Sequence, residues 1–192
     1  QPSANPVTIQ YDQIELTDGT VLRISQLKVM GKEVVAHPLE NSEGKFILKP
    51  FALSHLISWL RSADNLEYQA EWAKLLGSRG KRDFFVVRQS TGLNPLIGTL
   101  LEGNADGTRV KFERDDGQQV SLPLSRATGG LLLNPPQQNI ASQSLCRVVD
   151  IFGNRIEAAK LIRKNQGMQV VTVSGVDLEY QSLDSLITLD FS

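Results

Sequence analysis

The sequence is poor in the residues that build catalytic and metal centres. Its 192 residues include one cysteine, Cys146, and two histidines, His37 and His55. A single cysteine excludes an internal disulfide framework and a cysteine-rich metal site. Neither histidine has a second ligand at a metal-binding spacing. We therefore expect no metal ion and no cofactor, and the apolar neighbours of Cys146 indicate a buried core thiol.

Motifs of nucleophilic and nucleotide chemistry are also missing. The chain has no GxSxG turn for a nucleophilic serine and no GxxxxGK[ST] loop for phosphate. Acidic residues such as Asp18, Asp106 and Asp115 lie in turns, where aspartate is favoured for its backbone hydrogen bonding. We expect no catalytic residues and no enzyme activity. A hydrolase that uses scattered acidic residues is the remaining catalytic alternative.

Charge and hydropathy exclude two further classes of partner. The chain carries 20 Lys and Arg against 21 Asp and Glu, a net charge of −1, so its overall field does not favour nucleic acid. No run approaches the roughly 20 apolar residues that span a bilayer, so we expect no membrane span. Hydrophobic residues make up 41% of the chain, which is enough for a packed core.

Short alternating apolar segments, separated by glycine-containing turns, occupy most of the chain. Such alternation is typical of strands with one buried face, and an Asp-Gly pair between two of them indicates a hairpin. The same spacing separates a turn glycine from a later leucine in Gly19–Leu27 and in Gly153–Leu161. This recurrence predicts an internal repeat, and we interpret Asp106-Gly107 as its middle counterpart.

These patterns predict a mainly β fold of three small antiparallel units with one linking α-helix. Each unit is barrel-like or half-open with roughly four or five strands, because so few residues bury little surface alone. The predicted boundaries are an extended lead-in over 1–7, a first unit over 8–61, a linking helix and basic loop over 62–82, a second unit over 83–133, a Pro/Gln linker over 134–144 and a third unit over 145–192.

The linking helix is predicted over 62–76. Leu66, Ala70, Ala73 and Leu76 or Leu75 recur at helical spacing and form its expected apolar face, which Trp72 flanks. Ser62 or Asp64 is the expected N-cap.

Aromatic and basic residues around this helix are the candidate contacts for a ligand or partner. They are Trp59, Tyr68, Trp72, Arg79, Lys81 and Arg82. We favour the interpretation in which both tryptophans pin the helix over an open sheet end and the basic loop is a solvated linker. In the alternative, the aromatic side chains form an exposed stacking platform for sugars, and the basic loop contacts phosphate or an acidic partner.

The order of several short motifs is similar to a known protein region. The motifs are Trp72-Ala73-Lys74-Leu75-Leu76, the run from Arg82 to Arg88, Leu96-Ile97-Gly98, and a last unit with Cys146 that ends Leu189-Asp190-Phe191-Ser192. Over residues 14–192 the chain resembles the β-rich N-terminal region of exported planctomycete proteins that carry a novel carbohydrate-binding module downstream. That module itself has no counterpart here. Each unit also resembles Sm-like and SH3-like small barrels, an analogy of fold alone.

Together these observations predict a non-catalytic interaction or scaffold region of an exported bacterial protein. The alternative is a carbohydrate- or peptide-binding module that uses the aromatic platform or an exposed strand edge. The expected partner is therefore a protein or a glycan, and a homo-oligomer stays open. The resemblance implies a periplasmic or extracellular location, with the cytoplasm as the alternative.

Overall fold

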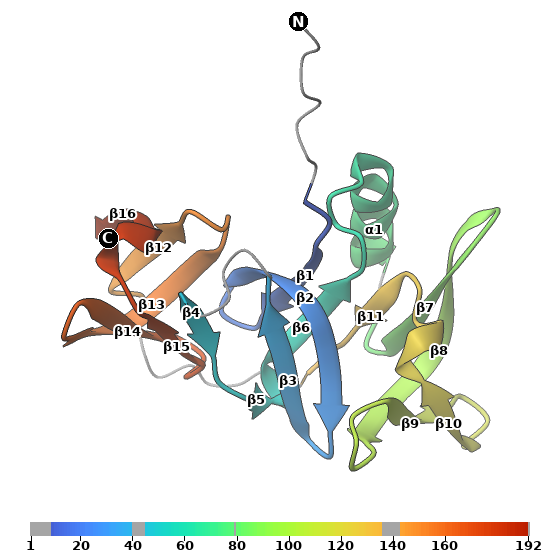
Figure 1. Ribbon diagram of the computed structural model, residues 1–192. Coiled ribbons are helices and arrows are strands. Elements are labelled where there is room, and N and C mark those ends of the chain that lie inside the picture. Colours follow the sequence, from blue (N-terminus) through green and yellow to red (C-terminus); the bar gives the residue numbers. More distant parts are fainter. Residues whose placement is uncertain (1–8, 40–44, 79, 136–142, 192) are drawn as a thin grey trace, which may run out of the picture.

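The computed structural model describes residues 9–39, 45–78, 80–135 and 143–191 of the chain. Over these residues the protein is mainly β, with a single α-helix, as the sequence predicts (Figure 1). The predicted lead-in over 1–7 and most of the predicted Pro/Gln linker lie outside the described residues. No helix in these four ranges combines the length and the apolar character needed to cross a membrane.

The strands fall into three consecutive segments. The first segment contains β1 (Asp12–Leu16), β2 (Val21–Met30), β3 (Glu33–Pro38), β4 (Phe46–Leu48), β5 (Phe51–Ala52), the 3-10 helix η2 (Leu53–His55) and β6 (Leu56–Leu60). After the helix α1 (Leu66–Ser78), the middle segment contains β7 (Asp83–Gln89), β8 (Gly92–Gly103), β9 (Arg109–Arg114), β10 (Gln119–Pro123), η3 (Leu124–Arg126) and β11 (Gly130–Leu132). The last segment contains β12 (Cys146–Asp150), β13 (Arg155–Lys164), β14 (Gly167–Thr172), β15 (Asp177–Tyr180), η4 (Leu183–Ser185) and β16 (Leu186–Phe191).

All of these strands belong to one antiparallel sheet. Its main path runs β10-β9-β8-β7-β11-β6-β1-β2-β13-β14-β15-β4. Within each segment the closing strand returns to pair with the first, as β6 with β1, β11 with β7 and β16 with β12. The segments are also joined by hydrogen bonds, because β6 pairs with β11 and β4 pairs with β15. The sequence predicts separate packed units and does not anticipate this continuous pairing.

The first and last segments turn and close in the same way. Gly19 and Gly153 have positive φ angles of 85° and 87°, a conformation that favours glycine, in the hairpin turns β1–β2 and β12–β13. Asp106-Gly107 lies in the β8–β9 turn instead, so its interpretation as the counterpart of Asp18-Gly19 is wrong. The middle segment makes its first hairpin turn between β7 and β8, immediately before Gly92.

The same backbone hydrogen bond is found where the first segment and the last segment close. The backbone N–H of Thr17 donates to the carbonyl of His55 at 2.9 Å, and the N–H of Ile151 donates to the carbonyl of Ser185 at 3.0 Å. Both acceptors are the last residues of the 3-10 helix that precedes the closing strand. The two segments therefore bring the first turn and the closing strand together through the same bond.

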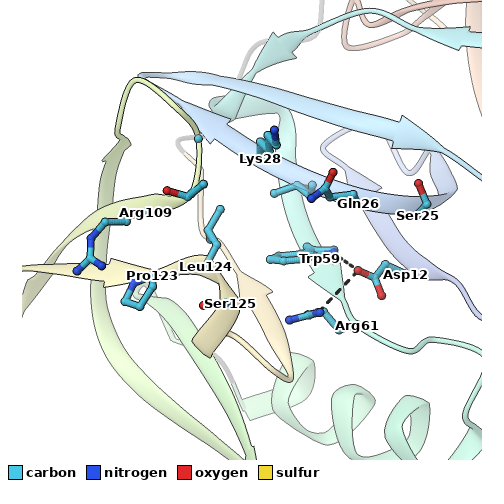
Figure 2. Close-up of a pocket in the computed structure, with 13 residues that line it drawn as sticks. Asp12, Ser25, Gln26, Lys28, Trp59, Arg61, Arg109, Pro123, Leu124 and Ser125 are labelled. Atoms are coloured by element: carbon cyan, nitrogen blue, oxygen red, sulfur yellow. Dashed lines mark hydrogen bonds and ion pairs between the residues drawn. The ribbon is translucent and has the colours of Figure 1, made fainter.

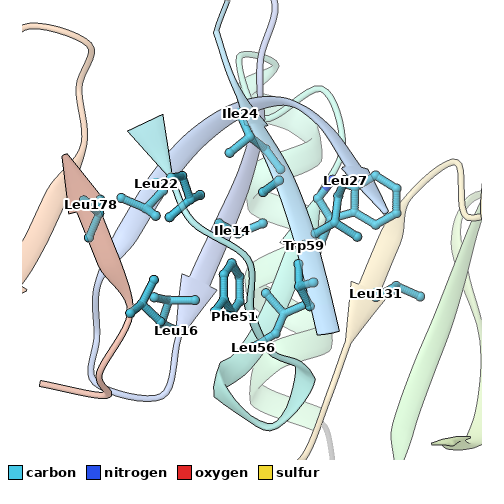
Figure 3. Packing of buried hydrophobic residues seen from close by; sticks show 14 of the residues in the cluster. Ile14, Leu16, Leu22, Ile24, Leu27, Phe51, Leu56, Trp59, Leu131 and Leu178 are labelled. Carbon is cyan, nitrogen blue, oxygen red and sulfur yellow. The ribbon is translucent and has the colours of Figure 1, made fainter. Parts of the chain in front are cut away.

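One hydrophobic core runs through all three segments. Leu131 of the middle segment and Leu178 of the last segment lie on either side of first-segment residues such as Leu22 and Leu56, and all four are fully buried (Figure 3). Cys146 belongs to the same core and is fully buried, which confirms the prediction of a core thiol. Burial raises the pKa of this thiol.

The helix packs through a face that matches the predicted one only in part, because Leu75 and Leu76 pack against a core cluster whereas Leu66, Ala70 and Ala73 are exposed. α1 begins at Leu66 and not at 62, and the N–H of Glu67 donates to the side chain of Asn65, so Asn65 and not Ser62 or Asp64 caps it. Leu66 is 77% exposed, whereas Trp72 is 4% exposed and packs in a second core cluster with strand residues of the first and middle segments. The large ring buries more apolar area than the smaller residues of the predicted face, so it determines how the helix is oriented.

Candidate functional site

The candidate site is a hollow between the first and middle segments. Its volume is about 450 Å³. Its lining residues come from β1, β2, β6, the residues around β9 and η3: Asp12, Ser25, Gln26, Leu27, Lys28, Trp59, Arg61, Gly107, Thr108, Arg109, Pro123, Leu124 and Ser125 (Figure 2). Because two segments supply its walls, the shape of this hollow depends on how they are joined.

Two backbone contacts hold these segments together. One is the β6–β11 pairing, and the other joins the β2–β3 turn to the end of β8, where Gly31 and Gly103 exchange N–H···O bonds of 3.2 and 2.7 Å. A Cβ atom on Gly103 would lie 1.7 Å from the carbonyl oxygen of Val29, so this approach requires glycine. The two contacts therefore fix the positions of the two walls.

Asp12 organises the floor of the hollow. One of its oxygens accepts the indole N–H of Trp59 at 3.0 Å, and the other accepts the backbone N–H of Ser62 at 3.0 Å. The guanidinium of Arg61 lies 3.8 Å from the first oxygen. Burial raises the pKa of Asp12, and the hydrogen bonds and Arg61 oppose that rise only in part. Both carboxylate oxygens already have partners, so Asp12 positions Trp59 and Arg61.

Positive side chains outnumber negative ones around the hollow. Lys28 and Arg61 lie on opposite sides of Trp59 (Figure 2). Arg109 is tied to β10, because its guanidinium donates to the hydroxyl of Ser121 at 2.9 Å and to the carbonyl of the same residue at 2.7 Å. Asp12 is the single acidic residue in the lining. The hollow therefore offers a positive surface within a chain of nearly balanced charge.

A second hollow continues from the first. It has a volume of about 380 Å³ and shares Asp12, Ser25 and Arg61 with it. Tyr11 lines it, and the guanidinium of Arg23 lies 4.3 Å from the centre of the tyrosine ring. We refer to the residues lining these two hollows as the basic groove. An elongated ligand, rather than a compact one, suits such a pair of adjoining hollows.

The exposed aromatic platform, the less favoured interpretation of the sequence, is not formed. Trp59 and Trp72 are each 4% exposed, which leaves no ring face for stacking. Tyr68 is half-buried, and the guanidinium carbon of Arg88 lies 3.3 Å from the centre of its ring. The rings anchor α1 and the floor of the groove, because burial of such large apolar surfaces is more favourable than exposure. Trp59 still contributes to the lining of the groove.

The predicted basic loop lies apart from the groove. Lys81 and Arg82 are exposed and do not line it, and Arg82 forms an ion pair with Asp115 of the β9–β10 turn. Arg79 lies outside the described residues. The sequence analysis missed Lys28 and Arg61. A signal was present in Ser25-Gln26, two successive polar residues that break the alternation of β2 where its pairing with β3 is irregular.

The most deeply buried acid has a structural role. Asp150 accepts hydrogen bonds from the backbone N–H groups of Phe152 and Asn154, from the side-chain amide of Asn154 and from the hydroxyl of Tyr180. With all of these donors in place and 1% exposure, it shapes the β12–β13 turn. Burial lowers the pKa of His55, the one histidine with a buried ring nitrogen among the described residues. Within the same residues, no three His, Cys, Asp or Glu side chains are grouped to hold a metal ion.

Comparison with known proteins gives no relative: no family model matches the chain, and no curated protein or solved structure is significantly similar to it.

Proposed function

We propose that this chain is a non-catalytic interaction region whose basic groove binds an extended, carboxylate-bearing peptide. The charge of the groove carries this proposal, because Lys28, Arg61 and Arg109 line it together with a single carboxylate that is already hydrogen-bonded. Ammonium and guanidinium groups form their strongest hydrogen bonds with carboxylates. The peptide would cross both hollows and place an acidic side chain beside Lys28.

The peptide fits the groove better than the other ligand that the sequence suggests. A glycan would need exposed ring faces for stacking, and both tryptophans are buried. The hydroxyl and amide groups of Ser25, Gln26 and Thr108 line the groove instead. Such groups can hydrogen-bond the backbone of an extended peptide.

The scaffold of this region is, in our proposal, three copies of one barrel-like unit. The return of each closing strand to the first strand of its segment supports this, as do the equal turns at Gly19 and Gly153. SH3-like and Sm-like barrels also close a short antiparallel sheet on itself. The resemblance to exported planctomycete proteins supports a periplasmic or extracellular location, which fractionation of the source cells with an antibody to the chain would test.

A peptide selection tests the proposed ligand. A phage-displayed library of random peptides is panned against the protein, with and without prior depletion on the Lys28→Glu variant. The proposal expects enriched peptides that are rich in Asp and Glu and that survive depletion, because the variant has lost the charge that binds them. If the enriched peptides bind wild type and variant equally, the groove is not the binding site.

A further inference from the structure

The pairing between the first two closing strands is locally symmetric. Trp59 of β6 lies opposite Leu131 of β11, and each of these residues also lies opposite a buried residue of its own segment's first strand, Ile14 and Phe85 respectively. On either side of this pair, the N–H of Arg61 donates to the carbonyl of Gly129, just before β11, at 3.2 Å, and the carbonyl of Ile57 accepts the N–H of Leu133, just after β11, at 2.7 Å. Two closing strands thus meet edge to edge, with corresponding residues facing each other.

β16, the closing strand of the last segment, resembles β6, but among the described residues no closing strand of another segment pairs with it. Pairing of β16 with β12 shifts register between Val149 and Asp150, as pairing of β6 with β1 shifts between Glu15 and Leu16. The last residues paired before the shift are Thr188 in β16 and Ser58 in β6. The next residues, Leu189 and Trp59, therefore correspond to each other. Among the described residues, β12 is the only strand that pairs with β16. Figure 1 shows β16 at the outer end of the molecule.

Two large apolar side chains are exposed on this edge. Ile187 is 63% exposed and Phe191 is 61% exposed. Phe191 lies opposite Cys146 in β12, and Leu189 lies opposite Val148, so these alternate residues of β16 share the face of two fully buried core residues. Their exposure therefore results from a missing neighbour rather than from an outward orientation.

By the same alternation, Ile187, Leu189 and Phe191 direct their backbone N–H and C=O groups away from β12, to the side of β16 where no other described strand pairs. The corresponding residues in and just after β6, Ile57 and Arg61, are the ones that hydrogen-bond to the residues flanking β11. An antiparallel strand that pairs with one neighbour through alternate residues offers the residues between them to the other neighbour. The N–H and C=O groups of Ile187, Leu189 and Phe191 are thus available to a further strand.

We propose that β16 pairs with β16 of a second copy of this chain, in an antiparallel two-fold arrangement centred on Leu189. A two-fold interface needs a self-complementary edge. This edge meets that condition, because the register about Leu189 places Ile187 of one copy opposite Phe191 of the other. Aromatic and β-branched residues form favourable cross-strand pairs. The β6–β11 pairing supplies the precedent within the chain.

The edge strand β10 differs from β16 in the residues that it exposes. β10 pairs only with β9 among the described strands, and it carries Gln119, Ser121 and Pro123. Polar residues and proline protect a sheet edge from unwanted pairing. β16 lacks such protection at Ile187 and Phe191. The second-copy proposal is independent of the basic groove, because no residue of β16 lines it.

Sedimentation equilibrium of the full chain, from low micromolar to several hundred micromolar protein, tests the association. The proposal expects a monomer–dimer equilibrium that the double variant Ile187→Lys, Phe191→Lys weakens by tenfold or more, since like charges would meet across the two-fold. Leu66→Lys, an equally nonconservative change at a more exposed site, should leave the equilibrium unchanged. Circular dichroism confirms that each variant is folded. A monomer at every concentration, or a dimer that both variants retain, would overturn the proposal.

Disulfide trapping tests the register. The proposed pairing places Thr188 of one copy opposite Asp190 of the other, at a non-hydrogen-bonded position where Cα atoms are about 4.5 Å apart and a disulfide can form. Both side chains are exposed, whereas the native Cys146 is fully buried. A mixture of the Thr188→Cys and Asp190→Cys variants should form a covalent dimer under mild oxidation, and each variant alone should form much less. Equal cross-linking of the single variants, or none in the mixture, would refute the register.

Discussion

Asp18, in the β1–β2 turn, accepts a hydrogen bond of 2.7 Å from the backbone N–H of Ser174, which lies 156 residues further along the chain. The other carboxylate oxygen accepts the N–H of Thr20 within the same turn at 2.9 Å. The hydroxyl of Thr20 in turn accepts the N–H of Glu157 at 3.0 Å. A turn that the sequence identifies by local backbone preference therefore also joins the first and last segments.

Asp18→Ala should lower the free energy of unfolding at pH 7 by about 1 to 3 kcal/mol, because two backbone donors lose their acceptor. Urea denaturation measures this change. Asp116→Ala is the matched control, since Asp116 also accepts from the backbone N–H of a residue two positions ahead, Gln118, within the β9–β10 turn. An equal loss of stability in the two variants would mean that the contact with Ser174 does not join the segments.

The Asp18 carboxylate also predicts a pH dependence. Burial raises its pKa, but hydrogen bonds from Ser174 and Thr20 outweigh that effect and hold the pKa below its ordinary value of 3.8. Its stabilising contribution is therefore complete above about pH 3.8 and disappears as the pH falls through the folded-state pKa. The stability difference between wild type and Asp18→Ala should shrink below pH 3.8. A difference that is constant down to pH 2 would contradict this assignment.

Gly103→Ala should destabilise the protein by about 1 to 3 kcal/mol, because the new Cβ atom would collide with the backbone of Val29 and push the first and middle segments apart. Gly80→Ala is the control, as nothing lies within 4 Å of a Cβ atom at that position. Thermal unfolding of both variants measures the difference. A Gly103→Ala protein as stable as the control would show that the two segments need not approach so closely.

The wild-type protein should lose stability at alkaline pH because of Tyr180, and Tyr180→Phe should lose less. Burial, together with the charge of Asp150, raises the pKa of Tyr180 well above 10.0. An unfolded chain ionises this tyrosine first, so the folded state loses stability as the pH rises above 10. Urea titrations between about pH 8 and 11 should show a shallower decline for the variant. Tyr68→Phe, outside the Asp150 network, serves as the control, and the same decline in all three proteins would disprove the contribution of Tyr180.

Trp72→Ala should cost about 3 to 5 kcal/mol, the loss typical of a large buried aromatic side chain. Leu66→Ala, on the exposed face of the same helix, should change stability by less than about 0.5 kcal/mol. Chemical denaturation of the two variants compares the faces directly. The face predicted from sequence would regain support if Leu66→Ala proved the more harmful change.

The sequence predicts the features of this fold that depend on neighbouring residues. Alternation and turn glycines such as Gly19 and Gly153 identify the strands, because burial repeats every second residue along strands such as β3 and β15. Helical spacing predicts the helix but only part of its buried face, since spacing alone does not distinguish Leu66, which is exposed, from Leu75 and Leu76, which pack against the core beside Trp72.

Contacts between segments could not be predicted in the same way. Backbone pairings between segments use groups that every residue carries, and a glycine that such a close approach requires, such as Gly130 beside Trp59, does not identify its partner in the sequence. The groove was missed for the same reason. Lys28 and Arg61 are separated along the chain, and only the return of β6 beside β1 brings them to opposite sides of Trp59.

The basic groove is proposed to bind a carboxylate-bearing peptide through Lys28. Calorimetric titration of one acidic peptide from the selection, into wild type and two variants, tests this binding. Lys28→Glu should weaken binding by about tenfold or more, because a charge-assisted contact is replaced by repulsion. Lys74→Glu makes the same charge change on the exposed surface of α1 and should leave the affinity unchanged. Equal affinities for Lys28→Glu and wild type would contradict the claim.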